Sequence, residues 1–171
     1  ADDRHGLDHD RLIREIGHGG MGAVWLAERA DGSLKRLIAL KLPRLAWGAG
    51  LAERMARERE ILATLEHPNI ARLYDAGVAG DGQPFMALEY VDGTSLDRLL
   101  QVKKKHTPIV AAYIASRAAA GLQAIHEQRH PDTGELLKIV HRDVSPSNLL
   151  LSIDGEVKVA DFGLVRAVAE A

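Results

Sequence analysis

The pattern of apolar residues changes at Asp92-Gly93, and this change restricts the chain to a fold made of two unlike parts. Before that point, short apolar stretches alternate with turn signals, which is typical of antiparallel sheet. Beyond it, apolar residues recur at spacings of three and four, which indicates helices. The sequence therefore predicts an α+β fold, with one part over residues 1–92 and the other over residues 93–171.

The first part is expected to be an antiparallel sheet with one helix. Asp31-Gly32 and Gly80-Asp81-Gly82 are turn signals that join neighbouring strands. A helix is predicted from about residue 51 to residue 65, because Met55, Glu58, Leu62 and Leu65 recur at spacings of three and four and so share one helical face. The expected strands cover residues 12–16, 23–27, 34–42, 73–74 and 85–91.

The second part is expected to begin with helices and to end in a hairpin. Thr94, with Asp97 three residues later, resembles a capping box that opens a helix over residues 95–104. Thr107-Pro108 is a start signal for a longer helix over residues 109–128. The hairpin strands are expected over residues 149–153 and 156–160, around Asp154-Gly155.

Composition excludes several classes of protein. The 22 Lys and Arg residues nearly balance the 24 Asp and Glu residues, which argues against a nucleic-acid partner. The chain has no cysteine, so disulfides, thiolate zinc sites and thiol nucleophiles are excluded. Apolar runs stay well short of the ~20 residues of a membrane span. We expect a soluble, cytoplasmic protein without a membrane-spanning segment.

A glycine cluster is the first candidate binding motif. The residues from Gly17 to Val24 fit the pattern G-x-G-x-x-G-x-V, in which glycines let the backbone approach phosphate oxygens closely. A tight turn is the alternative interpretation. A dinucleotide site needs a helix directly after the glycines, whereas Val24-Trp25-Leu26 favours a strand. The cluster is therefore expected at the tip of a hairpin that folds over a nucleotide.

Lys41 is a charged residue within an otherwise apolar strand. An unpartnered charge in that position is costly, so a carboxylate partner is expected. Glu58, on the apolar face of the following helix, is the natural candidate. The alternative is a lysine at a sheet edge whose ammonium group reaches water.

The third constellation lies near the end of the sequence. Residues 141–148 fit H-R-D-x-x-x-x-N, and Asp161-Phe162-Gly163 begins thirteen residues after Asn148. In such an arrangement one carboxylate can accept a hydroxyl proton, while a second carboxylate and an amide hold Mg²⁺ against phosphates. A chance D-F-G is common, but this motif behind the other three, in order, is not.

With these motifs in order, the sequence resembles the protein kinases, most closely the bacterial, eukaryotic-like serine/threonine kinases. The resemblance runs from about Leu12 to the end and includes His67-Pro68-Asn69-Ile70 and Glu89-Tyr90-Val91. It implies a small lobe of antiparallel sheet with one helix, followed by the first part of a mainly helical large lobe. It also implies ATP and Mg²⁺ as cofactors and a protein substrate.

The resemblance further implies roles for individual residues. Asp143 would be the catalytic base, and Asn148 and Asp161 would bind Mg²⁺. Lys41 would hold the α- and β-phosphates and pair with Glu58. The ATP-binding positions would be Ile16, Gly17, Gly19, Gly20, Gly22, Val24, Ala39, Lys41, Leu88, Glu89, Val91, Ser95, Leu150 and Asp161.

Two departures from the family pattern stand out. Ser145 occupies the position at which serine/threonine kinases usually carry a lysine near the γ-phosphate, which weakens the case for serine/threonine over tyrosine specificity. The sequence also ends eight residues after Gly163, before the rest of the activation segment and the substrate-docking helices. We therefore expect an uncovered apolar stripe through Ile114, Leu122 and Ile125, self-association and low activity on peptides.

Three alternative functions are consistent with parts of the sequence. A nucleotide-binding pseudokinase or kinase fragment could act as an interaction module. A small-molecule kinase of the aminoglycoside or choline type shares a catalytic Asp and a metal-binding Asn. The residues from His126 to His130 also fit the zinc-protease pattern H-E-x-x-H, but Pro131 predicts that the helix ends too early to align both histidines.

Overall fold

The structure is a computed structural model, and it describes residues 10–19, 22–31, 34–43, 59, 62–80, 82–102 and 105–161. It divides into two compact units. The first takes in the described residues of Ala1–Ala63 together with Leu73–Tyr90, and the second those of Thr64–Arg72 and Val91–Ala171. The predictions for Gly20, Glu58 and Phe162-Gly163 lie outside the described residues.

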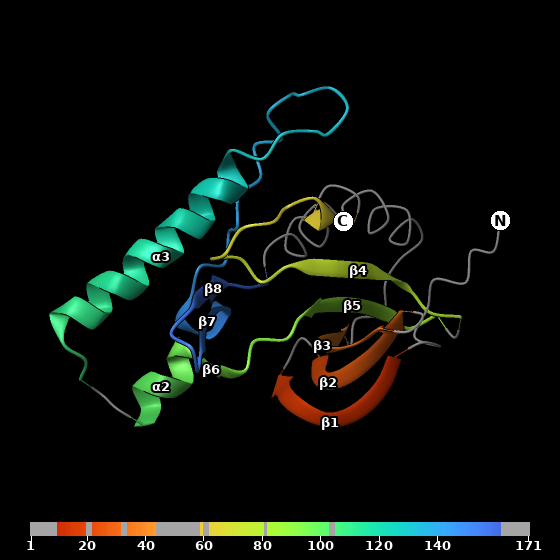
Figure 1. Cartoon of the computed structure of the whole chain (residues 1–171), viewed down its shortest axis with the longest axis horizontal. Coiled ribbons are helices and arrows are strands. Elements are labelled where there is room, and N and C mark those ends of the chain that lie inside the picture. Colours follow the sequence, from red (N-terminus) through yellow and green to blue (C-terminus); the bar gives the residue numbers. More distant parts are fainter. Residues whose placement is uncertain are drawn as a thin grey trace. The chain divides into compact units, whose positions relative to one another are not determined.

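The first unit is a five-stranded antiparallel sheet in the order β1-β2-β3-β5-β4 (Figure 1). Short hairpin turns account for the neighbours β1-β2-β3 and β4-β5, because a tight turn places the next strand beside the last. The connection from β3 to β4 is long, and it is β5 that pairs with β3. Every strand that the sequence predicted is present, and β4 is longer than expected. The strands are β1 (Asp10–Gly19), β2 (Gly22–Asp31), β3 (Leu34–Pro43), β4 (Leu73–Val78) and β5 (Pro84–Glu89).

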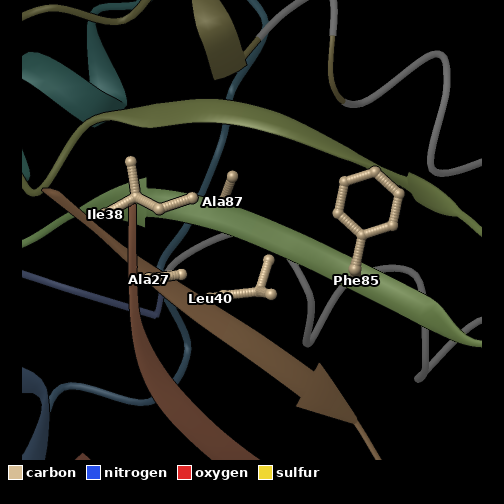
Figure 2. Packing of buried hydrophobic residues seen from close by; sticks show 5 residues of the cluster. All are labelled: Ala27, Ile38, Leu40, Phe85 and Ala87. Carbon is tan, nitrogen blue, oxygen red and sulfur yellow. The ribbon is translucent and has the colours of Figure 1, made fainter. Parts of the chain in front are cut away.

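One face of this sheet carries the hydrophobic core of the unit. Ala27 faces Ile38 across β2 and β3, and Leu40 faces Ala87 across β3 and β5. Phe85 completes the cluster, whose members are all at most 1% exposed (Figure 2). Because side chains alternate along a strand, the residues between these point to the opposite face of the sheet.

The predicted helix over residues 51–65 is described only in part. Arg59, Leu62 and Ala63 are helical, and Leu62 is buried at 6% exposure. These three residues are helical, as predicted, and residues 51–58, 60 and 61 lie outside the described residues.

The second unit contains a three-stranded antiparallel sheet in the order β6-β7-β8 and two helices. Its elements are β6 (Gly93–Ser95), α2 (Leu96–Val102), α3 (Pro108–His126), the 3₁₀ turn η2 (Pro146–Asn148), β7 (Leu149–Ser152) and β8 (Val157–Val159). Thr107 caps α3, as predicted, with its hydroxyl oxygen accepting the N–H of Val110 at 3.4 Å. The predicted hairpin around Asp154-Gly155 is β7–β8.

Helix α3 packs against β8 through a point of close approach at Gly121. A Cβ atom there would lie 2.5 Å from the carbonyl oxygen of Asn69 and 3.1 Å from a methyl group of Val159. A glycine is therefore required for the helix to lie this close to β8.

The segment Thr64–Arg72 belongs to the second unit although it precedes β4 in the chain. Ile70 forms a parallel bridge with Val159, and the N–H of Ala71 donates to the Val159 carbonyl at 2.9 Å. Asn69 is buried and donates from its side-chain amide to the carbonyl of Val157 at 2.9 Å. These bonds attach the segment to β8 through a single parallel bridge.

Helix α3 ends at His126, within two residues of its predicted end near residue 128. Two local expectations were wrong. Thr94 does not cap α2, because it lies in β6 and pairs with Leu151 of β7, and the hydroxyl of Ser95 accepts the N–H of Arg98 instead. The apolar stripe of α3 is not uncovered as predicted, because Ile114 and Ile125 are 8% and 0% exposed within the unit, and Leu122 is half-buried.

Among the helices that the structure describes, α3 alone has the length and apolar composition of a membrane span. This is weak support for a span, because a helix from the interior of a soluble protein passes the same test.

Candidate functional site

The glycine cluster lies at the end of the β1–β2 hairpin. Gly19 and Gly22 face each other across the two strands, so the hairpin places its glycines at the tip, as predicted. Gly22 has a φ of 130°, and a Cβ atom there would collide with the carbonyl oxygen of Leu42. A side chain at this position is therefore excluded by both backbone conformation and space.

The sheet face opposite the core gathers the predicted nucleotide-binding residues of the first unit. Gly17 faces Val24, Val24 faces Lys41, and Ala39 faces Leu88 across neighbouring strands. Cross-strand partners point to the same face of a sheet, so these five residues share one surface. A glycine, three apolar side chains and one ammonium group suit an adenine ring followed by phosphates.

Two further residues of the first unit lie at the margins of this face. Ile16 lies at a register irregularity of β1, between Glu15 and Gly17, which is where a β-bulge can redirect a side chain. Glu89 ends β5 opposite Ile38. Lys41 is half-buried, and its pairing with Glu58 stays a prediction because Glu58 lies outside the described residues.

The second unit holds the remaining predicted nucleotide-binding positions. Val91 begins this unit after β5, and Leu150 faces both Ser95 and Lys158 in the small sheet. The Ser95 hydroxyl oxygen caps α2 by accepting one N–H, so its hydrogen and a second lone pair can still be offered to a ligand.

The catalytic loop is held in place by a buried histidine. His141 is 1% exposed, and its Nδ1 accepts the N–H of Asp143 at 3.2 Å. The proton therefore sits on Nε2, which donates to the carbonyl oxygen of Ala160 at 2.8 Å. The ring thus links the start of the loop to the end of β8, directly before Asp161.

Asn148 also joins the catalytic loop to Ala160, at the end of β8. Its side-chain amide nitrogen donates to the carbonyl oxygen and to Oδ2 of Asp143, both at 2.9 Å. Its backbone carbonyl accepts the N–H of Ala160 at 2.9 Å. Asp143 is itself exposed, so its carboxylate is oriented by Asn148 and accessible to a substrate.

Two residues of the loop region have left-handed backbone conformations. Arg142 has a φ of 63° and Asp161 a φ of 59°, neither of which is favourable for a residue with a side chain. Such strain persists only where surrounding contacts enforce it, and it is concentrated at functional sites. Both residues adjoin atoms fixed by His141 and Asn148.

The donor set of the second unit suits Mg²⁺. Asp161 offers a carboxylate, and the amide nitrogen of Asn148 is engaged by Asp143, which leaves its Oδ1 as the ligating atom. Mg²⁺ is typically held by one or two protein oxygens, with phosphates and water completing the shell. Among the described residues no group of three or more His, Asp and Glu side chains could hold a metal by itself.

The H-E-x-x-H pattern does not form a zinc site. Helix α3 ends at His126, so His130 lies beyond it in a separate turn. There the Nδ1 atom of His130 accepts backbone N–H groups of Asp132 and Thr133, at 3.2 and 3.4 Å. That histidine stabilises a local turn.

Ser145, at the position of the usual lysine, contacts a neighbouring serine and does not supply the positive charge of a lysine. Its hydroxyl shares a 2.9 Å hydrogen bond with the hydroxyl of Ser147. The pair brings no positive charge to this part of the loop.

Ala160 is the functional position that the sequence did not reveal. Its carbonyl binds His141 and its N–H binds Asn148, so both halves of the loop depend on it. Backbone groups make these contacts, and an alanine gives no sequence signal for them.

Comparisons with known proteins agree with this geometry. The model of the protein kinase domain matches residues 11–171. The chain is 35% identical to tyrosine-protein kinase MasK of Myxococcus xanthus over 163 residues, which cover 91% of this chain and 25% of MasK. It is also 35% identical to serine/threonine-protein kinase PknB of Mycobacterium tuberculosis over 171 residues, covering 97% of this chain and 26% of PknB.

A solved structure gives the same result for the fold. The PknI kinase domain of Mycobacterium tuberculosis superposes with a TM-score of 0.72 at 28% identity, covering 91% of this chain and 60% of that one. The chain spans about a quarter of the length of the curated relatives MasK and PknB. Since the family model matches nearly the whole chain and the described motifs lie in the expected elements, the chain belongs to the protein kinase family.

Proposed function

We propose that this domain transfers the γ-phosphoryl group of ATP to serine or threonine hydroxyls of proteins. The observation that carries the proposal is the catalytic loop, in which Asn148 orients the carboxylate of Asp143, while His141 and Asn148 are both hydrogen-bonded to Ala160, next to Asp161. Phosphoryl transfer depends mainly on positioning and charge stabilisation, which such a preorganised loop can supply.

Each residue then has a distinct task. Asp143 accepts the proton of the attacking hydroxyl, because its oriented carboxylate is exposed. Asn148 and Asp161 hold Mg²⁺, which neutralises phosphate charge when bound. Lys41 binds phosphate oxygens with its ammonium group, and Val24 and Ala39 contact the adenine from their shared sheet face.

The choice of acceptor hydroxyl is supported by the relatives. PknB and PknD of Mycobacterium tuberculosis are named serine/threonine-protein kinases, whereas MasK is named a tyrosine-protein kinase. Ser145 makes tyrosine the second candidate, because the catalytic loop lacks the lysine typical of serine/threonine kinases. Because ATP is an intracellular substrate, the proposal places the domain in the cytoplasm.

Binding of nucleotide tests the proposal directly. Titration calorimetry of the 171-residue chain is expected to show ATP binding that depends on Mg²⁺. Lys41→Met should weaken this binding, and Asp161→Ala should remove most of its dependence on Mg²⁺. Lys105→Met, at an exposed position between α2 and α3, serves as the control. A folded chain without Mg²⁺-dependent ATP binding would refute the proposal.

A further inference from the structure

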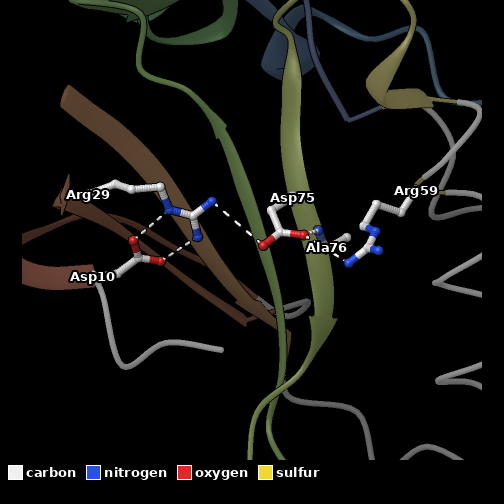
Figure 3. Close-up of polar contacts among 5 residues, drawn as sticks. All are labelled: Asp10, Arg29, Arg59, Asp75 and Ala76. Carbon is white, nitrogen blue, oxygen red and sulfur yellow. Dashed lines mark hydrogen bonds and ion pairs between the residues drawn. The ribbon is translucent and has the colours of Figure 1, made fainter. Parts of the chain in front are cut away.

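Four charged side chains form a continuous chain of ion pairs across the first unit (Figure 3). Arg29 donates from Nε and Nη2 to the two carboxylate oxygens of Asp10, at 2.7 Å each. Its Nη1 lies 3.7 Å from Oδ2 of Asp75. On the other side of Asp75, Nη1 of Arg59 donates to Oδ1 at 3.3 Å.

The four groups differ in burial from one end to the other. The side chain of Asp10 is completely buried, those of Arg29 and Asp75 are 11% and 15% exposed, and that of Arg59 is 33% exposed. Two carboxylates balance two guanidinium groups. A buried charge is tolerated when it is paired in this way, so the inner members are fixed as a unit.

Contacts within β4 orient the side chain of Asp75. The register of β4 against β5 shifts between Leu73 and Asp75, and such a bulge redirects the side chain that follows it. Oδ1 of Asp75 also accepts the N–H of Ala76 at 2.9 Å. Asp75 is thus a preoriented acceptor for a cation on the neighbouring helix.

That cation directly follows Glu58 in the sequence. Consecutive Cα atoms across a trans peptide bond are about 3.8 Å apart, so fixing Arg59 limits where Glu58 can lie. We propose that Arg59 and Asp75 are positioning residues, and that they hold the helix on the sheet so that Glu58 can pair with Lys41. The inference rests on the proposed function, because the pairing matters through the ATP phosphates that Lys41 binds.

The partial exposure of Arg59 distinguishes a positioning role from a general contribution to the stability of the fold. A partly exposed ion pair contributes little to the free energy of unfolding, since solvent screens it and both side chains lose freedom. Removing Arg59 should therefore leave the fold nearly as stable, since Leu62 stays buried, while loosening the attachment of the helix at Arg59. Loss of a purely stabilising contact would instead lower the unfolding temperature without a specific effect on ATP.

The experiment compares Arg59→Met with the parent in the 171-residue chain. Calorimetry should show Mg²⁺-ATP binding weakened by about 3-fold or more, as expected for residues coupled through one network. The unfolding midpoint should fall by no more than about 4 °C. Arg59→Lys keeps the charge and should restore most of the affinity. Arg11→Met removes an exposed pair with Glu28, of 3.5 Å in the same sheet, and should leave ATP affinity unchanged.

A second arm tests whether Arg59 acts through Glu58. In a Glu58→Gln background, Arg59→Met should weaken ATP binding no further, because the partner it positions is already lost. Amide hydrogen exchange of the peptide 59–65 should become faster in Arg59→Met and Asp75→Asn, with or without nucleotide.

The outcomes separate this inference from the proposed function. A parent that does not bind Mg²⁺-ATP refutes the proposed function and, with it, the role of the network in ATP binding. A parent that binds Mg²⁺-ATP while Arg59→Met binds it equally well refutes the inference alone. Additive losses in the Glu58→Gln background refute action through Glu58. Unchanged hydrogen exchange in the peptide 59–65 refutes the attachment of the helix to the sheet.

Discussion

Replacing Gly121 by alanine tests the close packing of α3 against β8. The new Cβ would lie 2.5 Å from the Asn69 carbonyl oxygen, which is already fixed as the acceptor of the Val159 N–H at 2.8 Å. A contact of this kind forces backbone to move, and overpacking of that sort costs about 1–3 kcal/mol. Alanine regains about 1 kcal/mol of helix propensity over glycine. We expect a net loss of ~1 kcal/mol, or about 2–4 °C in the unfolding midpoint.

Urea unfolding followed by circular dichroism measures this loss, with Ala119→Gly as the matched control. Ala119 is an exposed position of the same helix, so its replacement isolates the propensity term and should cost about 1 kcal/mol. If Gly121→Ala instead stabilised the chain by the amount that Ala119→Gly destabilises it, the close approach to Asn69 would be absent, and our account of the packing would be wrong.

Two further predictions concern the catalytic loop and the turn before it. In a protein extended through the rest of the kinase domain, Asp143→Asn should lower kcat by a large factor and leave ATP affinity nearly unchanged. Steady-state kinetics with a protein substrate measures both, and a kcat equal to that of the parent would contradict the assignment of Asp143 as the base. Lys138 is exposed and has a φ of 52°, so Lys138→Gly should relieve left-handed strain and raise the free energy of unfolding by up to about 1 kcal/mol. The matched Lys105→Gly, at a position without a positive φ, should lower it; urea unfolding that ranks the two variants the other way would contradict the strain.

The sequence motifs predicted the residues of the candidate site, but the sequence did not predict the backbone hydrogen bonds that hold those residues in place. The glycine hairpin, Lys41 on its apolar strand and the loop around Asp143 lie in the elements expected of them. Local patterns carry this information because each motif is a short run of chain. The hydrogen bonds to Ala160 could not be read in the same way, since backbone atoms far apart in sequence make them.

The fold was predicted where the periodicity of apolar residues is local and was missed where pairing is distant. The strands of the large sheet follow from alternation and turn signals. The spacing of Thr94 to Asp97 predicts a helix cap, but Thr94 lies in β6 and pairs with Leu151 of β7. Tertiary pairing overrode a local propensity at that position.

The attachment of Thr64–Arg72 to β8 has a consequence for synthesis on the ribosome. Asn69 and its acceptor Val157 are 88 residues apart in the chain. At about 5–20 residues per second, the segment waits roughly 4–18 s for its partner strand to be made. During that interval the sheet of the first unit can already form around β4 and β5, whereas buried Ile70 has no β8 to cover it. The nascent chain therefore exposes an apolar segment in its middle, where a chaperone can bind it, until β8 is made.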